Sequence, residues 1–189
     1  FPGFMESRER VELETALGDY FTDIPEEFTA FDTGSEELRR LLVERNFFPA
    51  EPEGDAGPLY LRDDERLAAQ LNEVDHVRIV SYRGGLNLAG ALEDADDMDD
   101  RIEDEFPFSV SLEWGYLTAH LDDLGTGLRA STMLHLPALR RLGLLEEALG
   151  EVWKEGFSVR GFSLDGVESL GDVYQIVSRQ TLGIAETEL

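Results

Sequence analysis

The sequence predicts a single α+β domain with an antiparallel sheet flanked by helices. The chain has 189 residues, a length that supports one domain with a hydrophobic core. Strand-like and helix-like segments follow one another without a regular strand–helix–strand rhythm, and this favours an antiparallel sheet over a parallel one. No internal repeat or long linker divides the sequence. We therefore expect residues 1–189 to form one domain.

Helical periodicity of apolar residues predicts three helices in the first half of the chain. Amphipathic helices are expected at 6–19 and 35–46, with Ser35 placed to cap the second. A third helix is expected at 87–104, where apolar residues line one face. We interpret its charge run at 93–105 as the hydrated side of this helix, not as a metal site.

Alternation and turn residues predict the strands and the remaining helix. The expected strands lie at 59–62, 66–71, 77–82, 108–117, 129–136, 157–162 and 172–178. Residues 49–58 are rich in Pro, Gly and acidic side chains, and are expected to form a loop. Pro137 suits the first turn of a helix, and leucines at helical spacing continue this helix to Trp153.

Charge and composition exclude several functions. There are 41 acidic and 16 basic residues, so the net charge is −25, and neither nucleic acid nor an anionic membrane is an expected partner. No apolar run approaches the roughly 18 residues of a membrane span. The chain has no cysteine, which rules out thiolate catalysis. It has only 3 histidines, so we do not expect a transition-metal site. The acidic composition fits either a saline habitat or simple solubility.

Three arginines occupy strand or turn positions and predict a phosphate site. They are Arg78, Arg129 and Arg160, and Arg129 follows a turn, Gly125-Thr126-Gly127, whose glycines allow backbone N–H groups to approach an anion. Each arginine alone is explained as a salt-bridge partner in an acidic chain. Together they favour phosphate, because the guanidinium fork binds oxygens bidentately and stays charged.

The same turn also fits a loose dinucleotide-binding pattern, Gly125-x-Gly127-x-x-Ala130. We reject that interpretation because an acidic Leu-Asp-Asp-Leu segment precedes the turn where the pattern needs an apolar strand. A strand, and not a helix, is expected to follow it.

Several segments resemble the ATP:guanido phosphotransferases. Residues 72–79 resemble the family's Asn-Glu-Glu-Asp-His-x-Arg-Ile segment, and 125–133 resemble its Gly-Thr-x-x-Arg-Ala-Ser segment. Val159-Arg160-Gly161, the stretch 171–178 and then Thr181-Leu182-Gly183 continue the similarity, which spans about 38–189 and is closest to the bacterial protein-arginine kinases. The resemblance implies a guanido-kinase (glutamine-synthetase-like) catalytic domain.

The resemblance also implies an activity, which is ATP-dependent phosphoryl transfer to a guanidino group of arginine, free or within a protein. Magnesium would be carried in by the nucleotide, and ATP dependence suggests a cytoplasmic location. The implied catalytic residues are Arg78, Arg129, Arg160 and His120. The implied ATP-binding residues are Asn46, Arg78, Arg129, Ala130, Ser131, Thr132, Met133, Arg160, Gly161, Phe162, Ser163, Leu164 and Asp165.

The sequence departs from the family pattern where the acceptor would bind. Val74 stands in place of the glutamate that orients the guanidinium, and a valine can neither pair with a cation nor take a proton. If the segment is a strand, Glu73 and Asp75 point to the opposite face. His120 stands in place of the reactive cysteine, and Asn46 replaces a histidine.

Two roles remain open. Asp122 or Asp123 either restores a carboxylate to a guanidine pocket or belongs to a solvated acidic loop, and both replace uncharged family residues. The chain is thus expected to be an arginine kinase or a pseudokinase that binds nucleotide and regulates other proteins. We also expect it to be cut from a longer chain, with the family's arginine-bearing strand upstream of Phe1.

Overall fold

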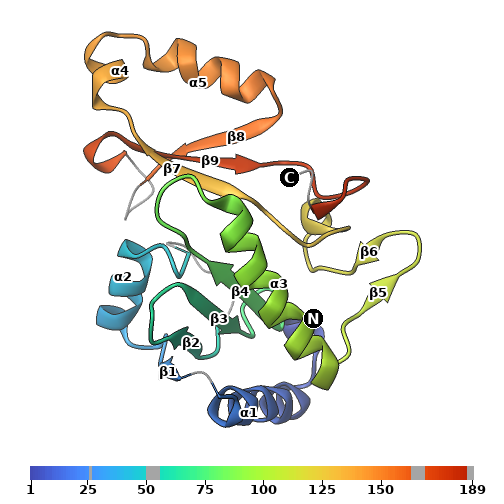
Figure 1. Ribbon diagram of the computed structural model, residues 1–189. Coiled ribbons are helices and arrows are strands. Elements are labelled where there is room, and N and C mark those ends of the chain that lie inside the picture. The colour runs from blue at the N-terminus through green and yellow to red at the C-terminus, as the bar shows by residue number, and fades with distance from the viewer. Residues whose placement is uncertain (26, 50–55, 163–168, 187–189) are drawn as a thin grey trace. The chain divides into compact units, whose positions relative to one another are not determined.

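The computed structural model describes residues 1–25, 27–49, 56–162 and 169–186. The chain divides into two compact units, Phe1–Pro107 and Phe108–Leu189, and each is described by itself. Both units combine helices with antiparallel strands (Figure 1), so the predicted α+β class is confirmed. No helix within the described residues is long and apolar enough to span a membrane.

The first unit contains one four-stranded sheet with the strand order β1-β2-β3-β4, and all neighbouring strands are antiparallel. Its elements are α1 (Ser7–Asp23), β1 (Phe28–Phe31), α2 (Glu36–Glu44), β2 (Leu59–Arg62), β3 (Leu67–Leu71), β4 (Val77–Ser81) and α3 (Leu88–Glu105). The predicted helices and the strands β2, β3 and β4 are confirmed to within a few residues. The four-residue strand β1 was not predicted.

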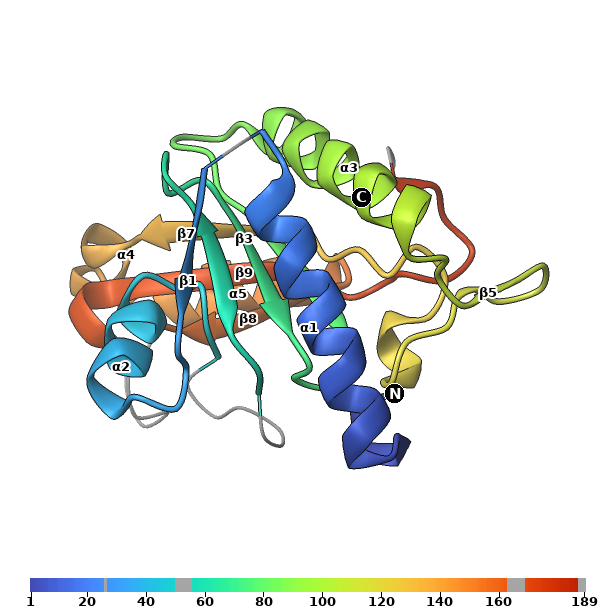
Figure 2. The same cartoon turned by 90° about the horizontal axis from the view of Figure 1, so that it is seen from below.

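Helices α1 and α3 cover the same face of this sheet. Phe21 of α1 stacks on Tyr60 of β2 with ring centroids 4.8 Å apart, and α1 runs across the strands in Figure 2. Arg62 lies two residues beyond Tyr60, so its side chain leaves the same face, and it pairs with Asp94 of α3 at 3.8 Å. Arg78 of β4 is paired with Gln70 in register, which places it on the opposite face.

The core of the first unit lies between these helices and the sheet. Its most deeply buried apolar side chains are Leu17, Phe21, Leu67, Leu71, Met98 and Ile102. Leu59, in register with Gln70, is fully buried on the opposite face of the sheet, and Leu42 of α2 is also buried. The Asn87 side chain caps α3 by accepting the Gly90 N–H at 3.1 Å. Ser35 occupies the predicted N-cap of α2, but its side chain makes no capping hydrogen bond.

The second unit contains a two-stranded hairpin and a three-stranded sheet with the order β7-β9-β8. Its elements are β5 (Val110–Ser111), β6 (Gly115–Tyr116), β7 (Ser131–His135), α4 (Pro137–Arg141), α5 (Leu145–Lys154), β8 (Phe157–Gly161) and β9 (Val173–Ser178). Arg140 of α4 donates to the Tyr174 hydroxyl at 3.2 Å. Helix α4 therefore reaches the face of β9 that carries Tyr174, and Gln175 points to the other face.

Two predicted elements of this unit were wrong in outline. The segment 108–117 is a hairpin and not one strand, because Gly115 adopts φ +69° and the Ser111 hydroxyl accepts the Glu113 N–H at 3.2 Å in a tight turn. The helix expected from Pro137 to Trp153 is two helices, since Gly143 adopts φ +71° and ends α4. Periodicity of leucines continues across this break, and so the sequence hides it.

Candidate functional site

The predicted site residues fall into both units. Asn46 and Arg78 belong to the first unit, and the others belong to the second. Ser163, Leu164 and Asp165 lie outside the described residues. All three predicted phosphate arginines occupy the strand or turn positions that the sequence analysis assigned to them, with Arg78 on β4, Arg129 before β7 and Arg160 on β8.

Arg78 is exposed and is the second residue of β4. Among the residues that the structure describes, its guanidinium makes no hydrogen bond or ion pair. The salt-bridge explanation of Arg78 therefore has no support in the described part of the unit. A free guanidinium on an otherwise acidic protein is available to an anionic ligand.

Asn46 has a structural role in the first unit. It follows the C-terminus of α2 with φ +60°, a left-handed conformation that asparagine tolerates better than most residues. Its side-chain nitrogen donates to the Tyr82 hydroxyl at 2.8 Å, and that hydroxyl donates to the Asn46 carbonyl oxygen. Asn46 is only partly buried, and its contact with the nucleotide remains a prediction.

Residues 72–76 form the turn between β3 and β4 and are not part of a strand, which corrects the sequence interpretation. Asn72 is fully buried with φ +46° at the start of this turn. Strand alternation therefore does not determine which way Glu73 and Asp75 point. Val74 is half-buried in the same turn.

A buried hydrogen-bond chain holds this turn. The Asn72 side-chain nitrogen donates to Glu14 Oε2 at 2.8 Å, so its oxygen must be the atom that lies 2.8 Å from His76 Nδ1. His76 therefore carries its proton on Nδ1 and donates it to Asn72. Burial lowers the pKa of His76, with further lowering from the amino terminus and Arg10, which keeps the ring neutral.

Close backbone contacts explain Gly125, the first glycine of the predicted phosphate turn, and Gly115, which packs against it. Gly125 adopts φ +103°, and a Cβ there would lie 2.9 Å from the Cα atom of Leu182. A Cβ at Gly115 would lie 2.8 Å from the Cα atom of Gly125. The Thr126 N–H donates to the Thr181 carbonyl at 3.1 Å, so three chain segments meet at this point. These glycines are required by backbone packing, whatever ligand the turn binds.

Replacing Gly125 with alanine is expected to lower the free energy of unfolding by about 2–4 kcal/mol, because a Cβ meets immovable backbone atoms at a forbidden φ. Gly127→Ala is the matched control, since Gly127 also has a positive φ but its nearest neighbour to a Cβ is 3.8 Å away. That control is expected to cost only about 1–2 kcal/mol. Urea denaturation measures both, and equal losses would contradict the packing explanation.

Arg129 is held by the short helical turn that precedes it. Its Nε donates to the Asp123 carboxylate, and Nη2 donates to the Asp122 carbonyl oxygen at 3.3 Å. Asp123 thus pairs with a predicted phosphate arginine, which is a different partner from the acceptor guanidine considered in the sequence analysis. His120 begins this turn and is exposed, and its carbonyl oxygen accepts the Thr118 hydroxyl at 2.8 Å.

One face of the three-stranded sheet, opposite the face that carries Tyr174, brings together predicted nucleotide residues of β7 and β8. Arg160, Gln175 and Met133 are cross-strand neighbours in register, so their side chains share one face. Ser131 lies on that face, two residues before Met133. Thr132 points to the opposite face, which removes its side chain from this group.

Gln175 is a residue of this face to which the sequence analysis gave no role. It accepts the Arg160 Nε–H at 2.8 Å and donates to the Ser131 hydroxyl at 3.0 Å. A glutamine within the largely apolar strand Val173–Ser178 was the available signal, because an amide that becomes buried needs specific partners.

Backbone contacts fix the ends of this face. The Ala130 N–H donates to the Ser178 hydroxyl at 3.0 Å, and the Ser178 N–H donates to the Ala130 carbonyl at 2.8 Å. Phe162 follows β8 and donates its N–H to Val173 at 2.8 Å. A Cβ at Gly161 would lie 2.8 Å from Ser169 Cβ, so this position needs a glycine where β8 ends.

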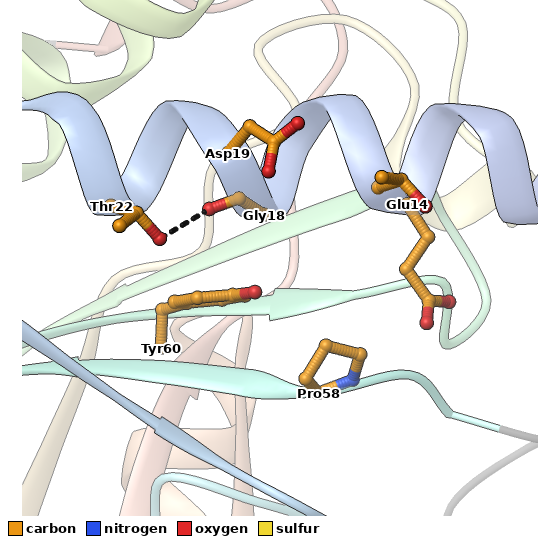
Figure 3. A pocket seen from close by; sticks show the side chains of 7 residues that line it. Glu14, Gly18, Asp19, Thr22, Pro58 and Tyr60 are labelled. Carbon is orange, nitrogen blue, oxygen red and sulfur yellow. Dashed lines mark hydrogen bonds between the residues drawn. The ribbon is translucent and has the colours of Figure 1, made fainter.

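The first unit also contains a pocket of about 310 Å³ that none of the predicted site residues lines. Figure 3 shows its floor, where the Tyr60 ring lies beneath Gly18 of α1 and Glu14 extends toward Pro58. Burial and the nearby carboxylates of Glu14 and Asp19 raise the pKa of Tyr60. This negative environment opposes phosphate, so the pocket is not a candidate for the nucleotide.

No group of three or more His, Asp or Glu side chains in the described residues is arranged to hold a metal ion. Asp94 of α3 is only 15% exposed and pairs with Arg62 and Arg83. Burial raises the pKa of Asp96 on the same helix, and the nearby carboxylates of Asp100 and Asp97 raise it further. Arg129 and Arg160 are cationic side chains with ordered Nε–H groups, and such guanidinium groups are suited to anionic ligands.

Comparison with known proteins gives a family match for nearly the whole chain. Residues 12–189 match the family described as ATP:guanido phosphotransferase, C-terminal catalytic domain. The protein-arginine kinase of Halothermothrix orenii is 41% identical over 153 residues, which is 80% of this chain and 44% of that protein. The protein-arginine kinase of Bacillus pumilus is 37% identical over 152 residues, or 80% of this chain and 42% of the relative. The chain therefore spans less than half the length of these curated relatives.

Solved structures share the fold. The duplicated taurocyamine kinase from Schistosoma mansoni, with bound transition state analog components, matches with a TM-score of 0.83 and 25% identity over 100% of this chain and 28% of that chain. Lombricine kinase matches with a TM-score of 0.80 and 22% identity, covering 100% of this chain and 57% of that chain. The fold is that of phosphagen kinase catalytic domains, as the sequence predicted.

Proposed function

This chain belongs to the ATP:guanido phosphotransferase family, and from that premise we propose that it transfers the γ-phosphoryl group of ATP to an arginine side chain within a protein. The protein acceptor is suggested by the identity to protein-arginine kinases. The observation that carries the proposal is the state of Arg129 and Arg160. Both are held through Nε by neighbouring acceptors, and Arg129 also donates from Nη2 to the Asp122 carbonyl oxygen. This ordering supports the use of Arg129 Nη1 and of both terminal nitrogens of Arg160 for phosphate.

The chemistry requires stabilisation of negative charge and removal of a proton. A bond forms between phosphorus and a guanidino nitrogen, the bond from phosphorus to the β,γ-bridging oxygen breaks so that ADP leaves with that oxygen, and the attacking nitrogen releases its proton to solvent. Negative charge in this loose transition state is spread over three equatorial oxygens, so positioned arginines supply most of the catalysis. In our proposal Arg78, Arg129 and Arg160 have this role.

The remaining predicted residues complete the proposal. Ala130, Ser131 and Met133 run along the nucleotide, and His120 with Asp122 contacts the acceptor. Magnesium arrives as the nucleotide complex and neutralises part of the phosphate charge. A cytoplasmic location belongs to the same proposal, because the reaction consumes ATP.

A second function, nucleotide binding without transfer, is favoured by Val74. The side chain lies half-buried in the turn before β4, and it cannot pair with a guanidinium or accept its proton. The donor-side arginines are present while this acceptor-side carboxylate is missing. A pseudokinase that senses nucleotide and regulates a partner would have this pattern.

Incubation of the full-length protein with magnesium-ATP and an unfolded, arginine-containing protein tests the two functions. We expect acid-labile phosphoarginine, identified by phosphorus NMR and mass spectrometry. The same substrate with its arginines replaced by lysine is the control and should stay unmodified. Nucleotide binding by calorimetry without any phosphoarginine would favour the pseudokinase, and no binding at all would exclude both functions.

A further inference from the structure

Three side chains form a hydrogen-bonded row across one face of the β7-β9-β8 sheet, opposite the face that carries Tyr174. Gln175 lies on the central strand with 6% of its surface exposed, between Arg160 on β8 and Ser131 on β7. Its Oε1 accepts the Arg160 Nε–H at 2.8 Å, and its Nε2 donates to Ser131 Oγ at 3.0 Å. The row joins residues 15 and 44 positions away from Gln175 in the sequence.

The chemistry of the three groups allows only one orientation of the amide. Arginine has donors and no acceptor, so the atom of Gln175 that faces Arg160 must be the oxygen. The amide nitrogen then faces Ser131, whose hydroxyl oxygen accepts. The serine hydroxyl proton is left pointing away from the amide, where a further acceptor can receive it.

The same contact sets the direction of the Arg160 guanidinium. Its Nε edge is occupied by Gln175, and within the described residues its two terminal nitrogens have no partner. Arginine side chains are long and lose rotamer entropy when they are ordered. A buried acceptor that is itself fixed by Ser131 pre-organises the terminal fork before a ligand binds.

We propose that Gln175 is a positioning residue, which orients Arg160 toward the transferred phosphoryl group and links it to Ser131 on the nucleotide-lining strand. The inference rests on the proposed function of Arg160 as a phosphate ligand. Gln175 itself touches no reacting atom. Its contribution is therefore realised through Arg160 and disappears when Arg160 is absent.

A double-mutant cycle in the full-length protein tests this role. Gln175→Leu keeps the size of the side chain and removes both hydrogen bonds, and we expect kcat for phosphoarginine formation to fall about 10-fold to 100-fold. In the Arg160→Ala background the same substitution should have almost no further effect, because a residue that acts through Arg160 has nothing left to orient. Gln175→Glu, which keeps the acceptor for Arg160, is expected to restore part of kcat.

The matched control is Gln180→Leu, the same substitution at an exposed glutamine beyond β9, which should leave kcat unchanged. Thermal unfolding of each variant shows whether the fold is intact.

Two results would overturn the inference while the proposed function stands. One is a Gln175→Leu variant that folds normally and keeps full kcat, and the other is a loss of kcat on Gln175→Leu that is as large without Arg160 as with it. A wild-type protein that neither binds nor uses ATP would overturn both. If the wild-type protein binds ATP without transfer, the same cycle is measured on nucleotide affinity, and non-additivity there would support the inference.

Discussion

Replacing Arg129 with alanine is expected to reduce phosphoarginine formation by about 10³-fold or more, the scale measured when a phosphate-stabilising arginine is removed. Nucleotide affinity should fall as well. Arg129 is held at Nε by Asp123 and is partly exposed, so its removal deletes cationic charge without opening a cavity in the core. Steady-state kinetics and calorimetry with magnesium-ATP measure the two effects.

Two further variants separate a phosphate ligand from a structural ion pair. The Arg129–Asp123 pair has side chains 38% and 27% exposed, and such a pair contributes less than about 1 kcal/mol to stability. Asp123→Ala breaks the pair too, yet it leaves the Arg129 cation in place, so nucleotide affinity should fall much less than in Arg129→Ala. Arg141→Ala, at an exposed arginine of α4, controls for the loss of one positive charge. Unchanged nucleotide affinity in Arg129→Ala would remove the basis of both proposed functions.

Substitution of Val74 by glutamate is expected to raise the rate of arginine phosphorylation by about 10²-fold to 10⁴-fold, the range for a positioned general base. The new carboxylate would pair with the acceptor guanidinium and take its proton. Val74 is only half-buried in the turn between β3 and β4, so a glutamate there remains in contact with water and the fold should tolerate it. Rates with an unfolded protein substrate, compared with those of the wild type, measure the gain.

Val74→Gln provides the matched control, because it has the shape of glutamate without its charge. A gain with glutamate alone would identify a kinase whose acceptor site lacks one carboxylate. Equal rates in wild type, Val74→Glu and Val74→Gln would show that the acceptor is activated by other groups, and the proposed role of this position would be abandoned.

Much of the fold was predictable because regular elements have a local signature. Strands β2, β3 and β4 and helix α3 all show the periodicity of their own structure, and they lie where the sequence placed them. The errors fall where backbone conformation changes within an unbroken pattern. Gly143 ends a helix inside a run of leucines, and Gly115 closes a hairpin inside a strand-like segment.

The candidate site was predictable only in part. Motif spacing selected Arg78, Arg129 and Arg160, and the structure confirms that each lies on a strand or directly before one. The sequence pattern gave no role to Gln175. It also predicted a strand at residues 72–76, which form a turn. The acceptors of the Arg129 and Arg160 Nε–H groups could not be identified from the sequence, because they depend on contacts outside the motif.

The amino-acid sequence by itself determined the α+β class, the approximate bounds of most elements, the family and the arginines that suit a phosphate. Those properties follow from side-chain periodicity and residue chemistry, which act over a few neighbouring positions. Only the tertiary structure decided which of these side chains meet. Strand register places Gln175 between Arg160 and Ser131, and the packing of Gly115 against Gly125 excludes any side chain there. Hydrogen bonds and close contacts are short-ranged and directional, so they depend on which distant segments the fold brings within about 3 Å.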